Sequence, residues 1–394
     1  MRILFVSDSY YPHLNGVYYF VCRVGPMLLE KGHEVAVIAP AASMRSSRRK
    51  IDGLDVYGLP SFSIWVYPSL RLPFPMFQKT RIRKIVKNFR PDIIHIQDHF
   101  LICKTVVRLN RKWKIPIVAT NHFMPENLTA LVRGNKLKQY LENFLWNDFS
   151  KVFNQVKKVT TPTETGVSIV RQMLHVETLA ISSGINLRNF NPGYDSKSIR
   201  DKYSIPDKPV FLYVGRLDPE KNIEEILHAA AIARRKIDFC LVIVGKGIKR
   251  SDLELKAGEL GISGNVIFTG FVPDADLPYI YSLSRCFIIS STAELLSLGT
   301  LQAMASGLPV IAVNAGALSE LVRHEMNGYL YNKGDLSSMV QYMLNIVTQN
   351  ELYETMSSKS VEYAKQHDIS KTVESFEKLY ELVAADGDNV KFQN

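Results

Sequence analysis

Residues 2–38, RILFVSDSYYPHLNGVYYFVCRVGPMLLEKGHEVAVI, hold two short apolar runs on either side of a helical pattern. The runs RILFV (2–6) and EVAVI (34–38) are apolar on both faces, as buried parallel strands are. Between them, apolar residues recur at helical spacing from residue 16, and the pattern stops at Gly32. This order predicts a βαβ unit and therefore a parallel sheet.

The same alternation continues along the chain and predicts an α/β fold with two doubly wound, Rossmann-like domains. Further apolar runs are DIIHI, IPIVAT, PVFLYVG, FCLVIVG, NVIFTG, CFIIS and LPVIAV. Residues 182–197, SSGINLRNFNPGYDSK, are rich in Gly, Asn, Pro and Ser and mark the boundary. We predict domains at 1–190 and 191–372, and a C-terminal helix at 373–394 that packs back on the first domain before a polar tail. Because ligands bind beyond the carboxyl ends of parallel strands, two such domains facing each other form a cleft.

Composition narrows the class of protein. The chain has 394 residues, of which 46% are hydrophobic and 22% charged, which suits a globular protein of two domains. Its four cysteines lie far apart, without the spacing of a zinc site or a disulfide framework. No apolar run reaches the roughly 18 residues that a spanning helix needs, and the N-terminus resembles a strand more than a signal peptide. We therefore expect a cytoplasmic protein.

Two strand-to-helix junctions in the second half are candidate anion sites. VGRLDPEKNIEEIL places Gly215, Arg216 and Lys221 where a helix begins, so that free amides and two cations could meet a phosphate. A solvated turn explains this motif equally well when it is taken alone. STAELLSLGT repeats the arrangement, with Ser297 and Leu298 opening a helix. Two such junctions in one domain favour a diphosphate ligand.

Other motifs carry less weight. Gly16 in SDSYYPHLNGV contacts a ligand or serves a plain βα loop, with neither favoured. HIQDH could supply metal ligands from His95, Asp98 and His99, but polar residues that line the cleft at a strand end are the favoured interpretation. No dinucleotide fingerprint or P-loop occurs, and GKG at 245–247 is too short to count.

Together these segments resemble the retaining glycosyltransferases of family 4, which have the GT-B fold. The segments that carry the resemblance are NGV, EKGHEVAVIAP, VGRLDPEKN, FTGFVPDADLPYIYSLS and STAELLSLGTLQAMASGLPVIAVNAGALSELV. The resemblance extends over residues 1 to about 375 and is densest in the second domain.

The resemblance implies that a nucleotide sugar binds in the cleft, held mainly by the C-terminal domain, while the N-terminal domain binds the acceptor. Its implied catalytic residues are Arg216 and Lys221 on the diphosphate, Glu294 on the hydroxyls of the donor sugar, and His122 near the transferred sugar. Its implied donor-binding residues are Gly16 and Gly215 in loops, the backbone at Phe271 and Val272 around the base, the amides of Ser297 and Leu298, and Gln302.

The implied chemistry needs no metal and no cofactor besides the nucleotide sugar. Cleavage of the bond to the nucleoside diphosphate places negative charge on the leaving phosphate, which fixed cations and helix amides stabilise. Members of the family are thought to retain the anomeric configuration, with the phosphate helping to deprotonate the acceptor.

The chain departs from the family pattern at two positions. Gln302 stands where relatives usually have a glutamate that binds ribose hydroxyls, and Ser297 where they often have glycine. An amide oxygen accepts a hydrogen bond without charge assistance, so we expect weaker donor binding but intact chemistry.

The net charge of +10 is concentrated between residues 41 and 90, which hold eleven Lys and Arg against two Asp. KTRIRKIVKNFR forms an amphipathic pattern whose apolar positions are Ile82, Ile85, Val86 and Phe89. An aromatic, Pro-broken loop precedes it. Taken alone, the helix is better explained by packing on the core; with the loop, the pattern favours an anionic membrane surface and a lipid acceptor. The residues proposed for that contact are Trp65, Phe74, Phe77, Arg81, Lys84 and Lys87. Nucleic acid is disfavoured, because no recognition motif accompanies the charge.

The leading hypothesis is an enzyme that transfers a hexose from a nucleotide sugar to a lipid or lipid-linked acceptor on the inner face of the cell membrane. UDP-glucose or UDP-galactose is preferred over GDP-mannose only because these donors are common in the family. Two alternatives remain: transfer to a soluble sugar or metabolite, and a non-catalytic subunit that binds nucleotide sugar. Gln302 is the best support for the latter.

Overall fold

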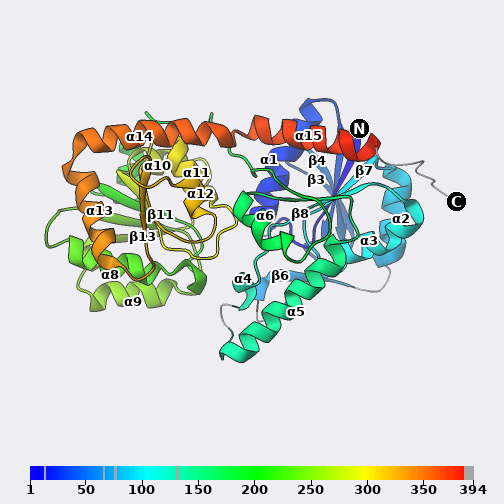
Figure 1. The fold of residues 1–394 in the computed structure, drawn as a ribbon, viewed down its shortest axis with the longest axis horizontal. Coiled ribbons are helices and arrows are strands. Elements are labelled where there is room, and N and C mark those ends of the chain that lie inside the picture. Colours follow the sequence, from blue (N-terminus) through cyan, green and yellow to red (C-terminus); the bar gives the residue numbers. More distant parts are fainter. Residues whose placement is uncertain (13–14, 65–66, 75–77, 130–131, 133, 386–394) are drawn as a thin grey trace. The chain divides into compact units, whose positions relative to one another are not determined.

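The computed structural model describes residues 1–385 except 13–14, 65–66, 75–77, 130–131 and 133, and it divides into two units (Figure 1). The first unit comprises residues 1–125, 132–184 and the chain from Ile369 onward. The second comprises residues 126–131 and 185–368. From the sequence we predicted a domain boundary at residue 190 and a C-terminal helix from residue 373 that packs on the first domain.

The first unit is built on an eight-stranded sheet in the order β10-β9-β8-β7-β1-β2-β4-β3, in which only the β3–β4 pair is antiparallel. Its strands are β1 (Arg2–Val6), β2 (Glu34–Pro40), β3 (Ser47–Ile51), β4 (Leu54–Leu59), β7 (Ile93–Ile96), β8 (Ile117–Thr120), β9 (Lys158–Thr161) and β10 (Thr178–Ala180). A separate hairpin pairs β5 (Ser61–Ile64) with β6 (Tyr67–Pro73).

Helices cover both faces of this sheet. One hydrophobic cluster joins the sheet to α2 (Gln78–Phe89), α3 (Leu101–Trp113), α5 (Asn135–Phe153) and α6 (Glu164–Arg171). A second cluster joins the other face to α1 (Gly16–Glu30) and the C-terminal helix α15 (Ile369–Ala385). Phe376 and Tyr380 of α15 are fully buried there, so the last helix is part of the first unit's core.

The second unit has a six-stranded parallel sheet in the order β13-β12-β11-β14-β15-β16. This is the Rossmann order, in which the direction of strand addition reverses between β11 and β14. The strands are β11 (Val210–Val214), β12 (Cys240–Val244), β13 (Val266–Gly270), β14 (Cys286–Ile289), β15 (Val310–Val313) and β16 (Gly328–Tyr331). The helical segments are α4 (Glu126–Thr129), α7 (Lys197–Lys202), η1 (Pro219–Lys221), α8 (Ile223–Ala233), α9 (Arg250–Glu259), η2 (Ser263–Asn265), α10 (Leu277–Ser282), α11 (Leu298–Ala305), α12 (Leu318–Leu321), α13 (Leu336–Thr348), α14 (Asn350–Ala364) and η3 (Lys365–His367).

The structure confirms the α/β class and each apolar run predicted as a strand. The prediction of an aromatic loop before α2 was wrong, because residues 61–64 and 67–73 pair as the β5–β6 hairpin. Within the described residues, no helix is both long and apolar enough to cross a bilayer.

Candidate functional site

The two predicted anion motifs lie side by side at the carboxyl ends of β11 and β14. These strands are neighbours in the sheet and flank the point where strand order reverses, which is where Rossmann-type sheets bind ligands. Gly215 and Arg216 follow β11, and Glu294 and Ser297 follow β14. Strand order therefore brings together residues about 80 positions apart in the chain.

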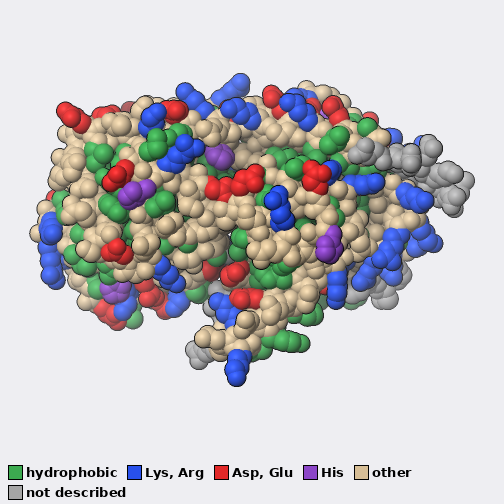
Figure 2. Space-filling model, viewed as in Figure 1, with side chains coloured by type: hydrophobic (Ala, Val, Ile, Leu, Met, Phe, Trp, Pro, Cys, Tyr) green, Lys and Arg blue, Asp and Glu red, His purple; other side chains and the backbone are tan. Residues whose placement is uncertain are grey.

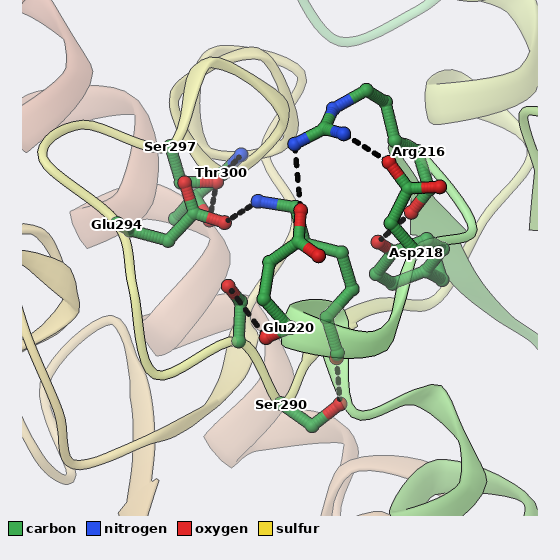
Figure 3. A network of polar contacts seen from close by, with 10 residues as sticks. Arg216, Asp218, Glu220, Ser290, Glu294, Ser297 and Thr300 are labelled. Atoms are coloured by element: carbon green, nitrogen blue, oxygen red, sulfur yellow. Dashed lines mark hydrogen bonds and ion pairs between the residues drawn. The ribbon is translucent and has the colours of Figure 1, made fainter. Parts of the chain in front are cut away.

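Lys221 and Glu294 form the central ion pair of this site (Figure 3). Lys221 Nζ lies 2.7 Å from Glu294 Oε1, and the two side chains are only 12% and 13% exposed. The hydroxyl of Ser290 donates to the carbonyls of Lys221 and Asn222, 2.9 Å from each, and so ties the end of β14 to the loop after β11. The pair is thus held from both strands.

Arg216 is surrounded by acids that the sequence prediction did not consider. Its guanidinium pairs with Asp218 and, at 2.6 Å, with Glu220 Oε1 (Figure 3). With Glu294, three carboxylates therefore accompany the two cations. They hold the cations in place, and a bound phosphate would compete with them for the same N–H donors.

The GKG turn braces the Arg216 loop, a role that the sequence analysis missed. A Cβ on Gly245 would lie 1.8 Å from the carbonyl oxygen of Gly215, and one on Gly247 would lie 2.3 Å from that of Leu217. The backbones are joined by hydrogen bonds from Gly215 N to Val244 O (3.0 Å) and from Leu217 N to the carbonyl of Lys246 (2.9 Å). Only glycine permits this close approach of two loops.

The N-terminus of α11 faces the same site. Ser297 is its N-cap, and its hydroxyl accepts hydrogen bonds from the amide of Thr300 (3.2 Å) and from the Thr300 hydroxyl (2.8 Å). Since Ser297 caps the third amide, the amides of Leu298 and Gly299 are those that helix geometry leaves without an intrahelical acceptor. They are the suitable donors for an anion here.

Gln302 lies one turn further along α11. Its Oε1 accepts a hydrogen bond from the hydroxyl of Tyr281 at 3.1 Å, and Tyr281 is fully buried. Tyr281 was not predicted, because its role depends on α10 lying against α11. Val272 is buried and Phe271 is exposed beside Lys246, whose ammonium lies 5.8 Å from the centre of the Phe271 ring.

Two predicted residues belong to the first unit. A Cβ built on Gly16 meets no atom within 4 Å, so packing in this unit does not require glycine there. His122 Nε2 lies 2.8 Å from Gln97 Oε1. Because an amide oxygen only accepts, Nε2 carries the proton and Nδ1 is left as an acceptor. Burial, with a contribution from Arg23, lowers the pKa of His122 to about 3, so the ring is neutral. Gln97 was not predicted.

The HIQDH residues are buried, so the expectation that they line the cleft was wrong. His95 uses both ring nitrogens, with Nδ1 2.7 Å from the Tyr380 hydroxyl and Nε2 2.6 Å from that of Thr120. His99 is enclosed by aromatic rings, and burial lowers its pKa to about 4. Neither histidine therefore joins Asp98 in a metal ligand set.

Asp98 instead neighbours Asp8 at the carboxyl ends of β1 and β7. Asp98 accepts from the Ser7 hydroxyl (2.8 Å) and the Asp8 amide (2.9 Å). Asp8 accepts from the first amides of α3, Ile102 N (2.6 Å) and Cys103 N (3.1 Å). Burial and the charge of Asp98 raise the pKa of Asp8 to about 7. These carboxylates serve the backbone of the first unit.

The residues predicted to contact a membrane differ in their exposure to solvent. Ile82 and Val86 are buried in the core, so the apolar face of α2 is not available to lipid. The cations of α2 gather on the surface in Figure 2. Phe74 is exposed and packs edge-on against Phe62, with ring centres 6.2 Å apart. Trp65 and Phe77 lie outside the described residues.

Comparison with known proteins agrees with the two-unit fold. Residues 14–189 match the model of Glycosyltransferase Family 4, and residues 195–363 match that of Glycosyl transferases group 1. The sucrose-phosphate synthase structure from Thermosynechococcus elongatus superposes with a TM-score of 0.79 at 19% identity, covering 98% of this chain and all of the other. The fold is therefore GT-B.

Sequence relatives cover nearly the whole chain. An alpha-monoglucosyldiacylglycerol synthase from Streptococcus pneumoniae is 29% identical over 385 residues, which span 93% of this chain and 83% of the relative. A GDP-mannose-dependent alpha-mannosyltransferase from Mycobacterium tuberculosis is 27% identical over 92% of both chains. The chain belongs to the glycosyltransferases of family 4, the family that the sequence motifs indicated.

Proposed function

We propose that this protein transfers a hexose from UDP-glucose or UDP-galactose to a lipid or lipid-linked acceptor at the cytoplasmic face of the membrane, with retention of configuration and without a metal. The observation that carries the proposal is the Lys221–Glu294 pair at the β11/β14 switch point, beside the free amides of α11.

These residues suit the breaking of a bond between a sugar and a diphosphate. The diphosphate leaves with the bonding electrons, and Lys221, Arg216 and the α11 amides offer positive charge and N–H donors to it. Glu294 offers carboxylate oxygens to sugar hydroxyls. The acceptor oxygen then bonds to the sugar carbon and gives its proton to a phosphate oxygen, so the sequence of steps needs no side-chain base.

A lipid acceptor is supported by the pneumococcal relative, whose name specifies a glucosyldiacylglycerol product. It is also supported by the basic surface of the first unit (Figure 2). The second candidate is mannosyl transfer from GDP-mannose, which the mycobacterial relative favours. Both candidates share the diphosphate chemistry and differ in the base and the sugar.

The test is a matrix of donors and acceptors with the purified full chain. UDP-glucose, UDP-galactose and GDP-mannose are each supplied with diacylglycerol in detergent or with soluble sugars, with and without EDTA. We expect a UDP-hexose to yield an α-linked glycolipid, by NMR of the anomeric proton, at a rate unchanged by EDTA. Transfer only from GDP-mannose, or only to soluble sugars, would overturn the corresponding part, and donor binding without turnover would indicate a non-catalytic subunit.

A further inference from the structure

Helix α5 has an apolar face that packs against nothing in the described structure. Leu137, Tyr140 and Phe144 are 54%, 68% and 59% exposed. Their spacing of i, i+3 and i+7 places them on one side of the helix. Large apolar side chains exposed singly are common, but three on successive turns of one helix form a patch typical of an interaction surface.

The other half of α5 anchors the helix to its unit. Phe149, Val152 and Phe153 are buried in the same cluster as the apolar residues of α2. Lys104 of α3 pairs with Asp148 at 2.5 Å. The N-terminal half extends beyond the other helices of this unit (Figure 1), so its apolar face is exposed on a rigid support.

Charge identifies the occupant of this face as an anionic surface. The first unit contains 29 Lys and Arg against 16 Asp and Glu, whereas the second contains 19 against 22. A second copy docked through α5 would bring two strongly positive units together, which Coulomb repulsion disfavours. An anionic bilayer attracts the same charge and also accepts apolar side chains.

We propose that the N-terminal half of α5 inserts Leu137, Tyr140 and Phe144 into the interface of an anionic bilayer, while the cations of α2 bind its headgroups. Both helices cover the same face of the β-sheet, so one planar surface can meet both. The inference rests on the proposed transfer to a lipid acceptor. It assigns apolar insertion to α5, because the apolar face of α2 is buried in the core.

The test is sedimentation of the full chain with phosphatidylcholine vesicles, with and without phosphatidylglycerol, at low and high salt. The insertion variant is Leu137→Ser/Tyr140→Ser/Phe144→Ser. The matched control is Leu255→Ser/Leu382→Ser, which removes two apolar side chains of similar exposure (67% and 52%). Leu255 belongs to the second unit, and Leu382 belongs to α15, which covers the face of the first unit's sheet opposite to α2 and α5. The charge variant is Lys84→Gln/Lys87→Gln.

We expect binding of the wild type to phosphatidylglycerol vesicles only, and a loss of about tenfold or more in the insertion variant at both salt concentrations. The charge variant should lose binding mainly at low salt, where screening is weak. The control should bind like the wild type. Should the triple variant unfold early in a thermal melt, Tyr140→Ser alone is compared, with a smaller loss expected.

Wild-type binding by the insertion variant, or an equal loss in the control, would overturn the proposal. So would a wild-type dimer, seen by analytical ultracentrifugation, that the insertion variant dissociates. Transfer to acceptor in detergent separates this inference from the proposed function, because the insertion variant should keep that activity. Loss of insertion with activity in detergent supports both, whereas an inactive wild type contradicts only the proposed function.

Discussion

The two sheets each have a switch point, and the two points are used in opposite ways. In the second unit, β11 and β14 are followed by Arg216, Lys221 and the unpaired amides of α11. In the first unit, β1 and β7 are followed by Asp8 and Asp98, which are both buried. Asp8 accepts hydrogen bonds from the amides of Ile102 and Cys103 in the first turn of α3, so two of the N–H donors that could bind an anion are already satisfied.

The comparison teaches that topology supplies only a place for a site. Both sheets bring two loops together where strand order reverses, yet side chains decide whether helix amides are offered to a ligand or consumed by the protein. Within the described residues, Asp8, Asp98 and Cys103 have the spacing of a possible cation site, but both carboxylates already accept backbone N–H groups. The substitutions at Lys221, Glu294, Gln97, Asp98 and Gln302 described below test this division.

The largest effect is expected at Lys221. Lys221→Ala removes the cation that lies against Glu294, and we expect kcat to fall by about 10²- to 10³-fold because charge on the leaving phosphate is no longer stabilised. Glu294→Ala should also remove turnover. Lys256→Ala is the matched control, since Lys256 pairs with Glu259 at 2.5 Å on the surface of the same unit. Kinetics with a labelled nucleotide sugar measure the effect.

An active Lys221→Ala or Glu294→Ala variant would contradict the assignment of chemistry to this switch point. Loss of activity in the control would indicate that any lost ion pair destabilises the unit. Thermal unfolding of each variant separates that case, because a merely unfolded variant would also lose its native transition.

Gln97 tests the role predicted for His122 in the first unit. Gln97→Leu removes the acceptor that holds the proton on Nε2, and we expect kcat to fall about 10- to 100-fold with little change in donor KM. Gln97→Glu keeps an acceptor but adds charge beside the ring, which should raise the pKa of His122 from about 3. Arg23 and His95 also face this ring, and Arg23 opposes the rise.

The measurements are the pH–rate profile and the ¹⁵N shifts of the imidazole. The wild type should show no His122 titration between pH 5 and 8, whereas Gln97→Glu should show one moving toward that range. Identical tautomers and profiles in all three proteins would show that Gln97 only packs against the ring.

The acid pair of the first unit predicts a pH-dependent stability. Asp8 has a folded-state pKa of about 7 against 3.8, so the folded state binds the proton more tightly than the unfolded state. Its contribution to stability is complete below about pH 4 and is lost as the pH rises toward 7. Asp98→Asn removes the charge that contributes to the raised pKa of Asp8. As the pH rises from about 4 toward 7, we therefore expect the free energy of unfolding of the variant to rise by about 1 kcal/mol relative to that of the wild type. Denaturant unfolding at several pH values measures the difference, and a constant difference would contradict it.

The sequence predicted the buried strands well because their residues are apolar on both faces. It missed β3, SRRKI, since charged residues fill an antiparallel edge strand, and β9 and β10, since they are short and rich in threonine. It also missed β4, LDVYGL, and β16, GYLY, in which polar residues and glycine interrupt the apolar run. Hydrophobic periodicity detects burial, and these strands carry too little of it.

The residues of the site were predicted from the ends of strands. The residues that this prediction missed are those whose roles depend on the order of the strands in the sheet. GKG was set aside as too short, yet β12 lies beside β11, so its glycines brace the Arg216 loop. Gln97 and His122 meet because β7 pairs with β8. A local motif does not show which strands are adjacent in the sheet, so the partners of a predicted residue were harder to find than the residue itself.

The smallest effect is expected at Gln302. Replacing it with glutamate adds an acid to the switch point of the second unit and so makes it more like the acidic switch point of the first. Gln302→Glu offers a carboxylate to ribose hydroxyls and still accepts from Tyr281, so nucleotide binding should tighten. The gain should be at most about tenfold, because Asp218, Glu220 and Glu294 already outnumber Arg216 and Lys221 there and a fourth acid repels the diphosphate. Calorimetric titration with UDP measures Kd, with Gln302→Met as the control that removes both hydrogen-bonding groups and should weaken binding. Weaker binding by Gln302→Glu than by the wild type would mean that repulsion between the added carboxylate and the diphosphate dominates. The switch point of the second unit would then tolerate no acid beyond Asp218, Glu220 and Glu294.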